Sequence, residues 1–421
     1  MPVDRRLVLG LAAGGALALG GCGAGRAERT IDFWAMGNEA AAVAPLLRAF
    51  EAARPGTRVR LQSLPWSAAH EKLLTGFAGG SLPHVAQVGN TWLAELAAIG
   101  ALAPLQGDTD WLTRDVFPAV VETNRIDGQL VAAPWYVDTR LQFVRTDIVR
   151  AAGQAPLPTD WAGWKRALVA IQRRAAPGDH AILLPLNEFE QLLTFALQQP
   201  EPLLRDDGTR GNFASAGFRA ALDFYVSLFR DGLAPQVSST TIANIWNEFA
   251  RGRFAVFLSG PWTVRELTVR QGPDFADRWA TMTMPGPDGP GAAAAGGSSL
   301  VVFDSARQRG DVAALVRYLG EPAVQARFNA LSDDLPARPS AWALAGLDRN
   351  PRMAPFAAQL SRARPVPKVP EWERIVTEMQ RVAELAVAGT LTIPAAAAEI
   401  DRRADALLAK RRWMRDKGRA A

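Results

Sequence analysis

The chain has few of the residues on which disulfide and metal chemistry depend. Among 421 residues there is one cysteine, Cys22, and there are three histidines. A single cysteine cannot form an intramolecular disulfide, and three scattered histidines leave no credible zinc or iron site. We therefore expect a fold held by its hydrophobic core, with no metal and no cofactor.

The sequence also lacks the marks of nucleotide and nucleic-acid binding. It has no G-x-x-x-x-G-K-[ST] motif, so ATP is not expected to bind through such a loop. The formal net charge is +5, and the basic residues are spread along the chain apart from the tail "KRRWMRDKGR". Because a nucleic-acid binder would show a concentrated basic face or a known module, we expect no nucleic-acid partner.

Long apolar runs are confined to the amino terminus. The run from Leu7 to Gly21 follows Arg5 and Arg6, and it is too short to span a hydrocarbon core of ~30 Å. It is typical of a signal-peptide core, with Sec export as the default. The quartet Leu19-Gly20-Gly21-Cys22 resembles a bacterial lipobox and predicts lipidation of Cys22. An ordinary signal peptide with an incidental cysteine is the alternative.

Strand-like runs alternate with helical patterns over the rest of the chain. Helices are predicted for "FRAALDFYVSLFRDGL" and "EWERIVTEMQRVAELAVAG", which end at Gly232 and Gly389. The strand-like runs end at Gly, Pro or Asn and include "TIDFWAM", "TRVRLQSL", "HVAQVG", "FAVFLSG" and "SSLVVF". This alternation predicts an α/β fold with mostly parallel sheets, and the length favours two domains. Residues 284–299 are predicted to form a flexible loop outside the core.

Tryptophans follow several of the strand-like runs. In open α/β sheets ligands bind beyond the carboxyl ends of the strands, so these tryptophans predict one aromatic cleft. A core position is equally plausible for any single one, but we expect at least two of the five to line the cleft. They are Trp34, Trp66, Trp92, Trp135 and Trp262.

The order and spacing of several motifs resemble the carbohydrate-binding lipoproteins of bacterial ABC importers. The resemblance is to the maltose/trehalose-binding-protein-like class, extracellular solute-binding protein family 1, and covers nearly all of the mature chain. Its motifs are "FWAMGNE", "LPWSAAHEKLLTGFAGGSLPHVAQVGNTWLAEL", "PWYVDTRLQFVRTDI", "PTDWAGW", "NIWNEFARGRFAVFLSGPW", "GGSSL" and "ARPVPKVPEWERI". Two departures are Pro83-His84-Val85 for Pro-Asp-Val, and Asp333-Asp334-Leu335-Pro336 for Gly-Asp-Leu-Pro. The second predicts a stiffer or displaced chain crossing.

The resemblance implies a two-lobe periplasmic-binding-protein fold (type II) with the ligand cleft between discontinuous lobes. It places a signal peptide at 1–21 and a lipidated linker at 22–30. The first lobe would comprise 31–137 and 300–333, and the second 141–297 and 336–421. Hinge crossings would fall near 138–140, 297–300 and 331–336.

The resemblance also implies the ligand-contacting residues. Aromatic rings would cover the apolar faces of a sugar, and carboxylates and amides would pair with its hydroxyls. The residues implied are Glu39, Asn90, Trp92, Tyr136, Asp138, Trp262, Gly297, Ser298 and Arg364. A second set, each with a plain structural role as its alternative, comprises Trp66, His70, Asn187, Glu188 and Trp372.

The implied function is that of an exported, lipid-anchored sugar-binding protein, and not of an enzyme. Located in the periplasm or on the outer side of the cytoplasmic membrane, the monomer would capture a disaccharide or oligosaccharide of the trehalose or maltose type. It would deliver the sugar to a membrane permease that has a separate ATPase. Alternatives are a binding protein for a glycerophosphodiester or other polyol, and a glycoside hydrolase that uses two acids among Glu39, Asp138 and Glu188 at ~5–9.5 Å.

If the lipobox is functional, Cys22→Ser should release the protein from membranes or leave the signal peptide uncut. Mass spectrometry of the mature amino terminus tests this prediction. An amino terminus well downstream of Cys22, without lipid, would contradict it.

Overall fold

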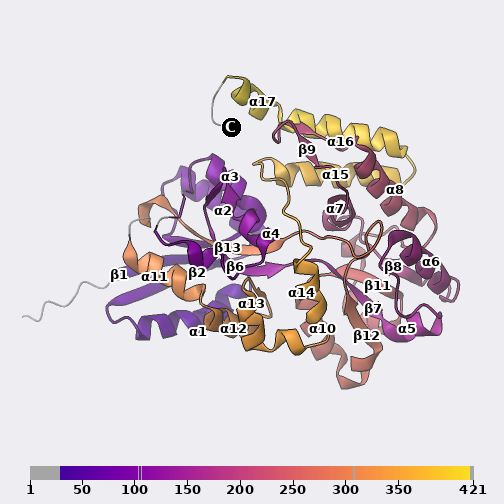
Figure 1. Ribbon diagram of the computed structural model, residues 1–421, viewed down its shortest axis with the longest axis horizontal. Coiled ribbons are helices and arrows are strands. Elements are labelled where there is room, and N and C mark those ends of the chain that lie inside the picture. The colour runs from indigo at the N-terminus through magenta and orange to yellow at the C-terminus, as the bar shows by residue number, and fades with distance from the viewer. Residues whose placement is uncertain (1–28, 103, 106, 307–308, 418–421) are drawn as a thin grey trace, which may run out of the picture.

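The computed structural model describes residues 29–102, 104–105, 107–306 and 309–417. The signal peptide, Cys22 and the linker up to residue 28 lie outside these residues, so their roles stay predictions. The molecule is elongated, and each half is built around its own sheet (Figure 1). Among the described residues, no helix combines the length and the apolar character needed to cross a bilayer.

The first sheet has six strands in the order β14-β6-β13-β3-β1-β2. Strand β1 runs parallel to β2 and β3, whereas β13 is antiparallel to β3 and β6, and β14 is antiparallel to β6. The bounds are β1 (Arg29–Met36), β2 (Thr57–Leu64), β3 (Val85–Gly89), β6 (Ala133–Asp138), β13 (Gly296–Val302) and β14 (Leu335–Pro336).

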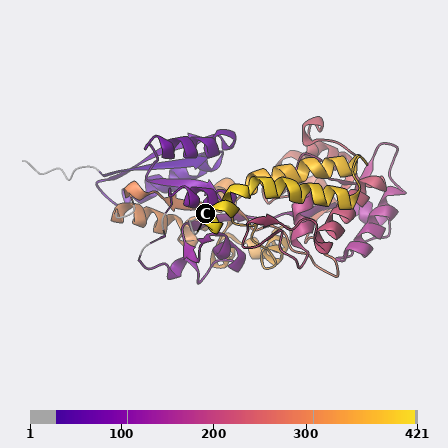
Figure 2. The same cartoon turned by 90° about the horizontal axis from the view of Figure 1, so that it is seen from above.

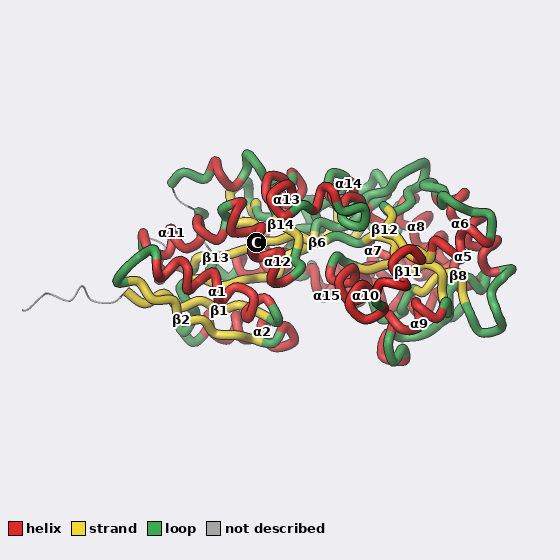
Figure 3. The backbone as a smooth tube through the Cα atoms, turned by 90° about the horizontal axis from the view of Figure 1, so that it is seen from below, coloured by secondary structure: helices red, strands yellow, loops and turns green. Residues whose placement is uncertain are grey.

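The second sheet has four strands in the order β12-β7-β11-β8, with only β11 and β8 parallel. The bounds are β7 (Leu141–Arg145), β8 (His180–Leu183), β11 (Phe254–Ser259) and β12 (Trp279–Met282). Figure 3 separates the two groups of strands along the molecule. Both sheets are mixed, so the prediction of mostly parallel sheets is wrong. The reason is that the chain leaves the first sheet through β6 and later returns to it antiparallel, as β13.

Helices cover both faces of the first sheet. Residues of β1 alternate between the two faces: Phe33 packs in the core with α1, α11 and α12, and Trp34 packs in the core with α2 and α3. The helices of this half are α1 (Glu39–Ala52), α2 (Trp66–Ala78), α3 (Leu93–Ala98), α4 (Pro118–Thr123), α11 (Gly310–Leu319), α12 (Pro322–Ser332) and α13 (Pro339–Ala345). A short hairpin, β4 (Arg125–Ile126) and β5 (Gln129–Leu130), follows α4.

The second half is more helical, and α8 and α15 confirm the two helices predicted from periodicity. Its helices are α5 (Thr146–Ala151), α6 (Trp161–Gln172), α7 (Phe189–Leu197), α8 (Ala216–Arg230), α9 (Ile245–Arg251), α10 (Trp262–Gln271), α14 (Ala354–Leu360), α15 (Trp372–Val387), α16 (Ile393–Leu407) and α17 (Ala409–Asp416). Helices α15 and α16 lie side by side along this half, and α17 leads back toward the middle of the molecule (Figure 2).

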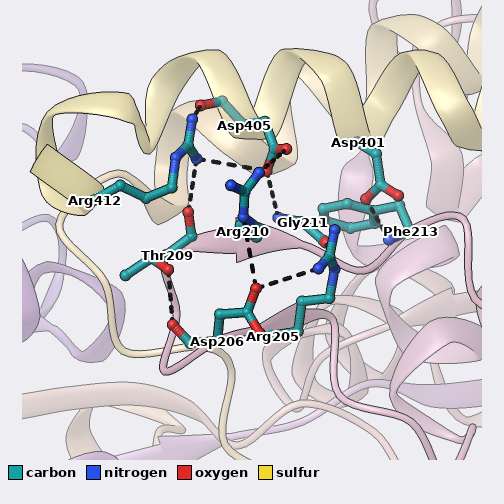
Figure 4. A network of polar contacts seen from close by, with 9 residues as sticks. All are labelled: Arg205, Asp206, Thr209, Arg210, Gly211, Phe213, Asp401, Asp405 and Arg412. Carbon is teal, nitrogen blue, oxygen red and sulfur yellow. Dashed lines mark hydrogen bonds and ion pairs between the residues drawn. The ribbon is translucent and has the colours of Figure 1, made fainter. Parts of the chain in front are cut away.

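A polar network attaches the carboxyl-terminal helices to the hairpin of β9 (Leu204–Arg205) and β10 (Arg210–Gly211), as Figure 4 shows. The carboxylate of Asp405 accepts a hydrogen bond from the Gly211 amide at 2.9 Å, and Asp401 accepts one from the Phe213 amide at 2.6 Å. Arg412 donates to the Thr209 carbonyl at 2.7 Å. These bonds fix the helices to the second half.

Three chain segments pass between the halves. Strand β6 leads through Thr139 and Arg140 straight into β7, and β13 begins directly after the loop that follows β12. The third segment follows β14, which still pairs with β6, and α13, and it leads to α14 of the second half. The lobe boundaries predicted from the resemblance stay a proposal.

The segment 284–299 differs from the expected flexible loop. Met284, Ala293 and Ala295 are buried, and the segment ends inside β13. The Arg364 amide donates to the Ala293 carbonyl, and the Ala295 amide donates to the Arg364 carbonyl. The low-complexity composition suggested a loop without fixed partners. Instead, the backbone of this segment is hydrogen-bonded at the junction of the two halves.

Glycine is required where β13 approaches β6. Gly297 has φ +106°, and a Cβ built there would lie 2.3 Å from the Tyr136 carbonyl oxygen. A Cβ on Gly296 would lie 2.1 Å from an Asp138 carboxylate oxygen. A side chain at Gly297 would displace the backbone of β6, and one at Gly296 would displace the Asp138 carboxylate.

Gly297→Ala should therefore lower the free energy of unfolding by about 1–3 kcal/mol or more, because strain and overlap add. Urea unfolding followed by circular dichroism measures this change. Gly310→Ala is the matched control, since a Cβ at Gly310 meets no atom within 4 Å. Equal stability of the two variants would contradict the required close approach.

Candidate functional site

A cleft of about 660 Å³ lies between the two halves. Its volume is within the usual range for small-molecule sites, about 300–1,000 Å³. Eight of the nine residues first implied by the resemblance line it: Glu39, Asn90, Trp92, Tyr136, Asp138, Trp262, Gly297 and Ser298. Trp66 and Trp372 of the second set line it as well.

The remaining four implied residues lie outside the lining of this cleft. Arg364 donates to the carbonyls of Leu197 and Gln199 at 2.8 Å and lines a neighbouring pocket. Asn187 exchanges hydrogen bonds with Ser239, and Glu188 accepts one from Gln191 at 2.8 Å.

The fourth of these residues, His70, is bonded to Glu95 at 2.7 Å and packs at 5.0 Å against the Trp92 ring. Like the other three, it has a hydrogen-bond partner that lies outside the cleft lining.

Three of the five post-strand tryptophans line the cleft. Trp66 and Trp92 meet edge to face at 5.5 Å on the side of the first sheet, and Trp262 lies on the opposite side. Trp66 is 36% exposed and Trp262 is 41% exposed, which is high for such large apolar side chains. Trp34 and Trp135 belong to the core instead; the Trp135 ring stacks on Phe328 at 4.4 Å.

Five helices begin at this cleft. Their first residues are Glu39, Trp66, Phe189, Trp262 and Trp372, all of which line the cavity. Free backbone N–H groups and the positive end of the helix dipole therefore point toward the cleft. Acidic residues in the first turns of α1, α7 and α15 complement that potential: Glu39, Glu190 and Glu373.

The Tyr136 hydroxyl joins four segments at the floor of the cleft. It donates to Glu39 Oε1 at 2.8 Å and accepts from Ser298 Oγ at 3.0 Å and from Gln87 Nε2 at 3.1 Å. One donation and two acceptances use the full capacity of a phenol. Tyr136 is only 5% exposed, and its hydroxyl orients the Glu39 carboxyl at the cleft.

Asn90 holds the strand that carries the two glycines. Its Nδ2 donates to the Gly296 carbonyl at 3.1 Å, and its Oδ1 accepts from Ser299 Oγ at 2.7 Å. Asn90 thus fixes the backbone of β13 next to Asp138.

Arg140 is the one cationic side chain among the described residues that line the cleft. It donates to Glu190 Oε1 at 3.1 Å, and its guanidinium lies 4.9 Å from the Trp262 ring centroid. Its charge is therefore already balanced by Glu190, and its orientation is set by Trp262.

Among the described residues that line the cleft, carboxyl groups outnumber the single cation, and burial raises the pKa of two of them. Burial raises the pKa of Asp138, although Arg140 acts in the opposite direction. Burial, followed by the negative charge of Glu39, raises the pKa of Asp334 to about 8. Burial likewise raises the pKa of Tyr136 well above its ordinary value. Asp334 is therefore mostly a neutral acid at pH 7.

Glu190, Glu373 and Asp334 were missed as lining residues by the sequence reasoning. The signal for the two glutamates was available, because each lies in the first turn of a helix that begins at the cleft. Asp334 was noticed only as part of an unusual motif. Its neutral state depends on burial beside Glu39, which is remote in the sequence.

Comparisons with known proteins give a consistent result. The family model described as "Bacterial extracellular solute-binding protein" matches residues 35–326. A binding protein from Brucella abortus (strain 2308) is 23% identical over 373 residues, which are 86% of this chain and 89% of the relative.

Solved structures agree with these matches. The sugar-binding protein MalE from Xanthomonas citri is 49% identical, with a TM-score of 0.88, covering 92% of this chain and 99% of that chain. The GacH receptor of Streptomyces glaucescens, solved unliganded and with acarbose, has the same fold at 23% identity. Its TM-score is 0.77, and the match covers 91% of this chain and 99% of that chain.

The raised pKa of Asp334 predicts a pH-dependent stability. Its pKa is about 8 in the folded protein and about 4 in an unfolded chain, so the folded state loses stability as pH rises through this range. Asparagine cannot ionise, so Asp334→Asn does not lose stability in this way. The melting temperature of Asp334→Asn relative to wild type should rise by roughly 2–5 °C between pH 5 and pH 9.

Asp333→Asn provides the matched control in a scanning-calorimetry series. Asp333 pairs outward with Arg265 at 2.5 Å, so its replacement should not reproduce this pH profile. A constant difference between Asp334→Asn and wild type from pH 5 to pH 9 would contradict the raised pKa.

Proposed function

The chain belongs to the bacterial extracellular solute-binding protein family, and we propose that it is a sugar-binding protein of the MalE type that serves an ABC importer. Its ligand is a neutral disaccharide or oligosaccharide, with trehalose and maltose as the best candidates. The bound sugar is released chemically unchanged to a membrane permease, which is powered by a separate ATPase. The 49% identity to a sugar-binding protein over 92% of the chain supports this assignment.

The cleft lining is the observation that carries the proposal. A sugar ring has apolar C–H faces, which stack on aromatic rings, and hydroxyls, which require polar partners when buried. Trp66 and Trp92 on one side, and Trp262 on the other, provide rings on both sides of the cleft. Carboxylates and helix amino ends between them provide hydrogen-bond acceptors and donors.

The charges in the cleft disfavour a glycerophosphodiester. Phosphate sites use clustered arginines and lysines or a free helix amino end. Here the lining cation, Arg140, is paired with Glu190, and three of the helix amino ends that reach the cleft carry a carboxylate in their first turn. An anionic ligand would be repelled by these groups, whereas an uncharged sugar would not.

Binding without hydrolysis also fits the position of Asp138. The relatives are binding proteins, and Asp138 ends the strand that crosses to the second half. A catalytic acid at such a crossing would lose its geometry whenever the lobes opened. We propose instead that the lobes close over the sugar, as hinged binding proteins do.

The same proposal includes the place of the protein in the cell. It is exported to the cell envelope, anchored by lipid at Cys22, and acts as a monomer on the outer side of the cytoplasmic membrane or in the periplasm. The lipobox-like quartet supports the anchor, and membership of an extracellular family supports the export.

Calorimetric titration with trehalose, maltose and other neutral disaccharides tests the ligand class. Wild-type protein should bind at least one of them, and glycerophosphodiesters should not bind. Trp262→Ala should weaken sugar binding roughly ten- to hundredfold, because an exposed stacking ring worth about 1–3 kcal/mol is lost. The fold should survive, since Trp262 is 41% exposed.

Trp413→Ala is the matched control, because Trp413 is 50% exposed but lies on α17, outside the cleft lining. It should bind sugar like the wild type. Unchanged affinity of Trp262→Ala would remove Trp262 from the site. Catalytic release of monosaccharide from excess disaccharide, abolished in Asp138→Asn, would replace the binding role with a hydrolase.

A further inference from the structure

The segment between α12 and β14 brings two adjacent acids into different surroundings. Asp333 has φ +65° and pairs with Arg265 of α10 at 2.5 Å. Asp334 lines the cleft instead, beside Glu39, Tyr136 and Asp138. Among the described residues, its carboxyl oxygen Oδ2 is buried without a hydrogen-bond partner.

The backbone of Asp334 is held firmly in this position. Its amide donates to Ser332 Oγ at 3.1 Å, and its carbonyl accepts from Asn329 Nδ2 at 3.0 Å. Both partners belong to the last turn of α12. The carboxyl is therefore directed by a rigid segment, which is a common feature of groups that contact a ligand.

We propose that Asp334 is a further ligand-contacting residue, which enters the cleft as a neutral carboxylic acid and donates a hydrogen bond to an oxygen atom of the bound sugar. This inference rests on the proposed sugar-binding function and adds a determinant of specificity to it.

The charged groups around Asp334 favour its neutral form. Glu39 faces it from α1 and Asp138 from β6, and both add negative charge, as does Asp333 on its own segment. The neighbouring cations are engaged elsewhere, Arg265 with Asp333 and Arg140 with Glu190. Burial among carboxylates keeps the pKa of Asp334 at about 8, so its proton is retained at pH 7.

The hydrogen-bond inventory around Asp334 shows what this proton can do. The donors Gln87 and Ser298 are both directed at the Tyr136 hydroxyl, and that hydroxyl donates to Glu39. Glu39 Oε1 accepts that hydrogen bond, and a carboxylate offers acceptors only. These side-chain donors are therefore already engaged, and the Asp334 proton adds a side-chain donor to the backbone N–H groups at the start of α1.

Deprotonation of Asp334 removes that donor and adds a charge beside Glu39. If the protonated form is the one that binds, affinity should be constant well below pH 8 and fall about tenfold per pH unit above it. Near pH 9 the loss relative to pH 6.5 should be on the order of tenfold.

Calorimetric titration with maltose and trehalose from pH 6 to pH 9.5 tests this inference. Wild-type affinity should follow the profile above. Asp334→Asn keeps an N–H donor and has no titrating charge, so its affinity should not fall above pH 8. Asp334→Leu removes the donor and should bind at least tenfold more weakly than wild type at pH 6.5.

Asp333→Asn is the matched control, since it removes one acid from the same segment but on the side of Arg265, and asparagine tolerates a positive φ. It should keep the fall in affinity at high pH, beginning at a slightly lower pH than in wild type because the small contribution of Asp333 to the pKa of Asp334 is removed. If Asp334→Leu does not fold, the sugar affinities of Asp334→Asn and wild type above pH 8 still test the role of Asp334.

Two failures are distinguishable. Sugar binding that is independent of pH, and equal in wild type and Asp334→Leu, overturns the role of Asp334 and leaves the sugar-binding function intact. A wild-type protein that binds no neutral sugar at pH 6.5 overturns the proposed function itself, and this inference with it.

Discussion

The buried hydroxyl of Tyr136 is the contact on which the cleft depends. It connects β6 to α1 through Glu39, to β3 through Gln87 and to β13 through Ser298. These segments are far apart in the sequence, and each contributes to the floor or wall of the cleft. Because all three bonds are buried or partly buried, loss of one partner would leave another polar group unpaired, at a cost of about 1–3 kcal/mol. The close approach of Gly297 to the Tyr136 carbonyl allows β13 to lie near enough for this arrangement.

The parts of the fold that follow from local pattern were predictable from sequence. The spacing of apolar residues in α8 and α15 and the glycines that follow them are sufficient signals, because each amphipathic helix has one face to bury. Sheet direction was not predictable in this way. Whether a strand runs parallel depends on where the chain crosses between halves, and no local pattern records that crossing. The buried segment 284–299 was missed for a similar reason, since its backbone is paired by the distant Arg364.

In the candidate site, too, some features follow from local sequence and others depend on tertiary packing. The motifs located the cleft through residues that begin helices or end strands, such as Trp66, Trp262 and Asp138. Sequence could not decide which long polar side chains reach the cleft. Arg364 donates instead to the carbonyls of Leu197 and Gln199, at the end of α7 and just beyond it. Tertiary packing therefore determines where its guanidinium lies. The protonation of Asp334 is likewise a tertiary property, because it depends on burial and on Glu39.

The placement of the polar groups bears on how ligand binding would be connected to the proposed lobe movement. Tyr136, Asp138 and Arg140 lie on or beside the first crossing, Gly297 lies where the chain returns, and Asp334 lies before the third crossing. The large exposed rings lie farther out, at the first turns of α2 and α10. A sugar held by the polar groups would therefore contact the backbone segments that must rotate when the lobes move. A sugar held only by Trp66 or Trp262 would contact one lobe. Since a ligand shifts a conformational equilibrium only by its difference in affinity for the two states, closure requires contacts that both lobes make together. If the lobes close as proposed, the polar crossings and the opposed rings would provide such contacts together.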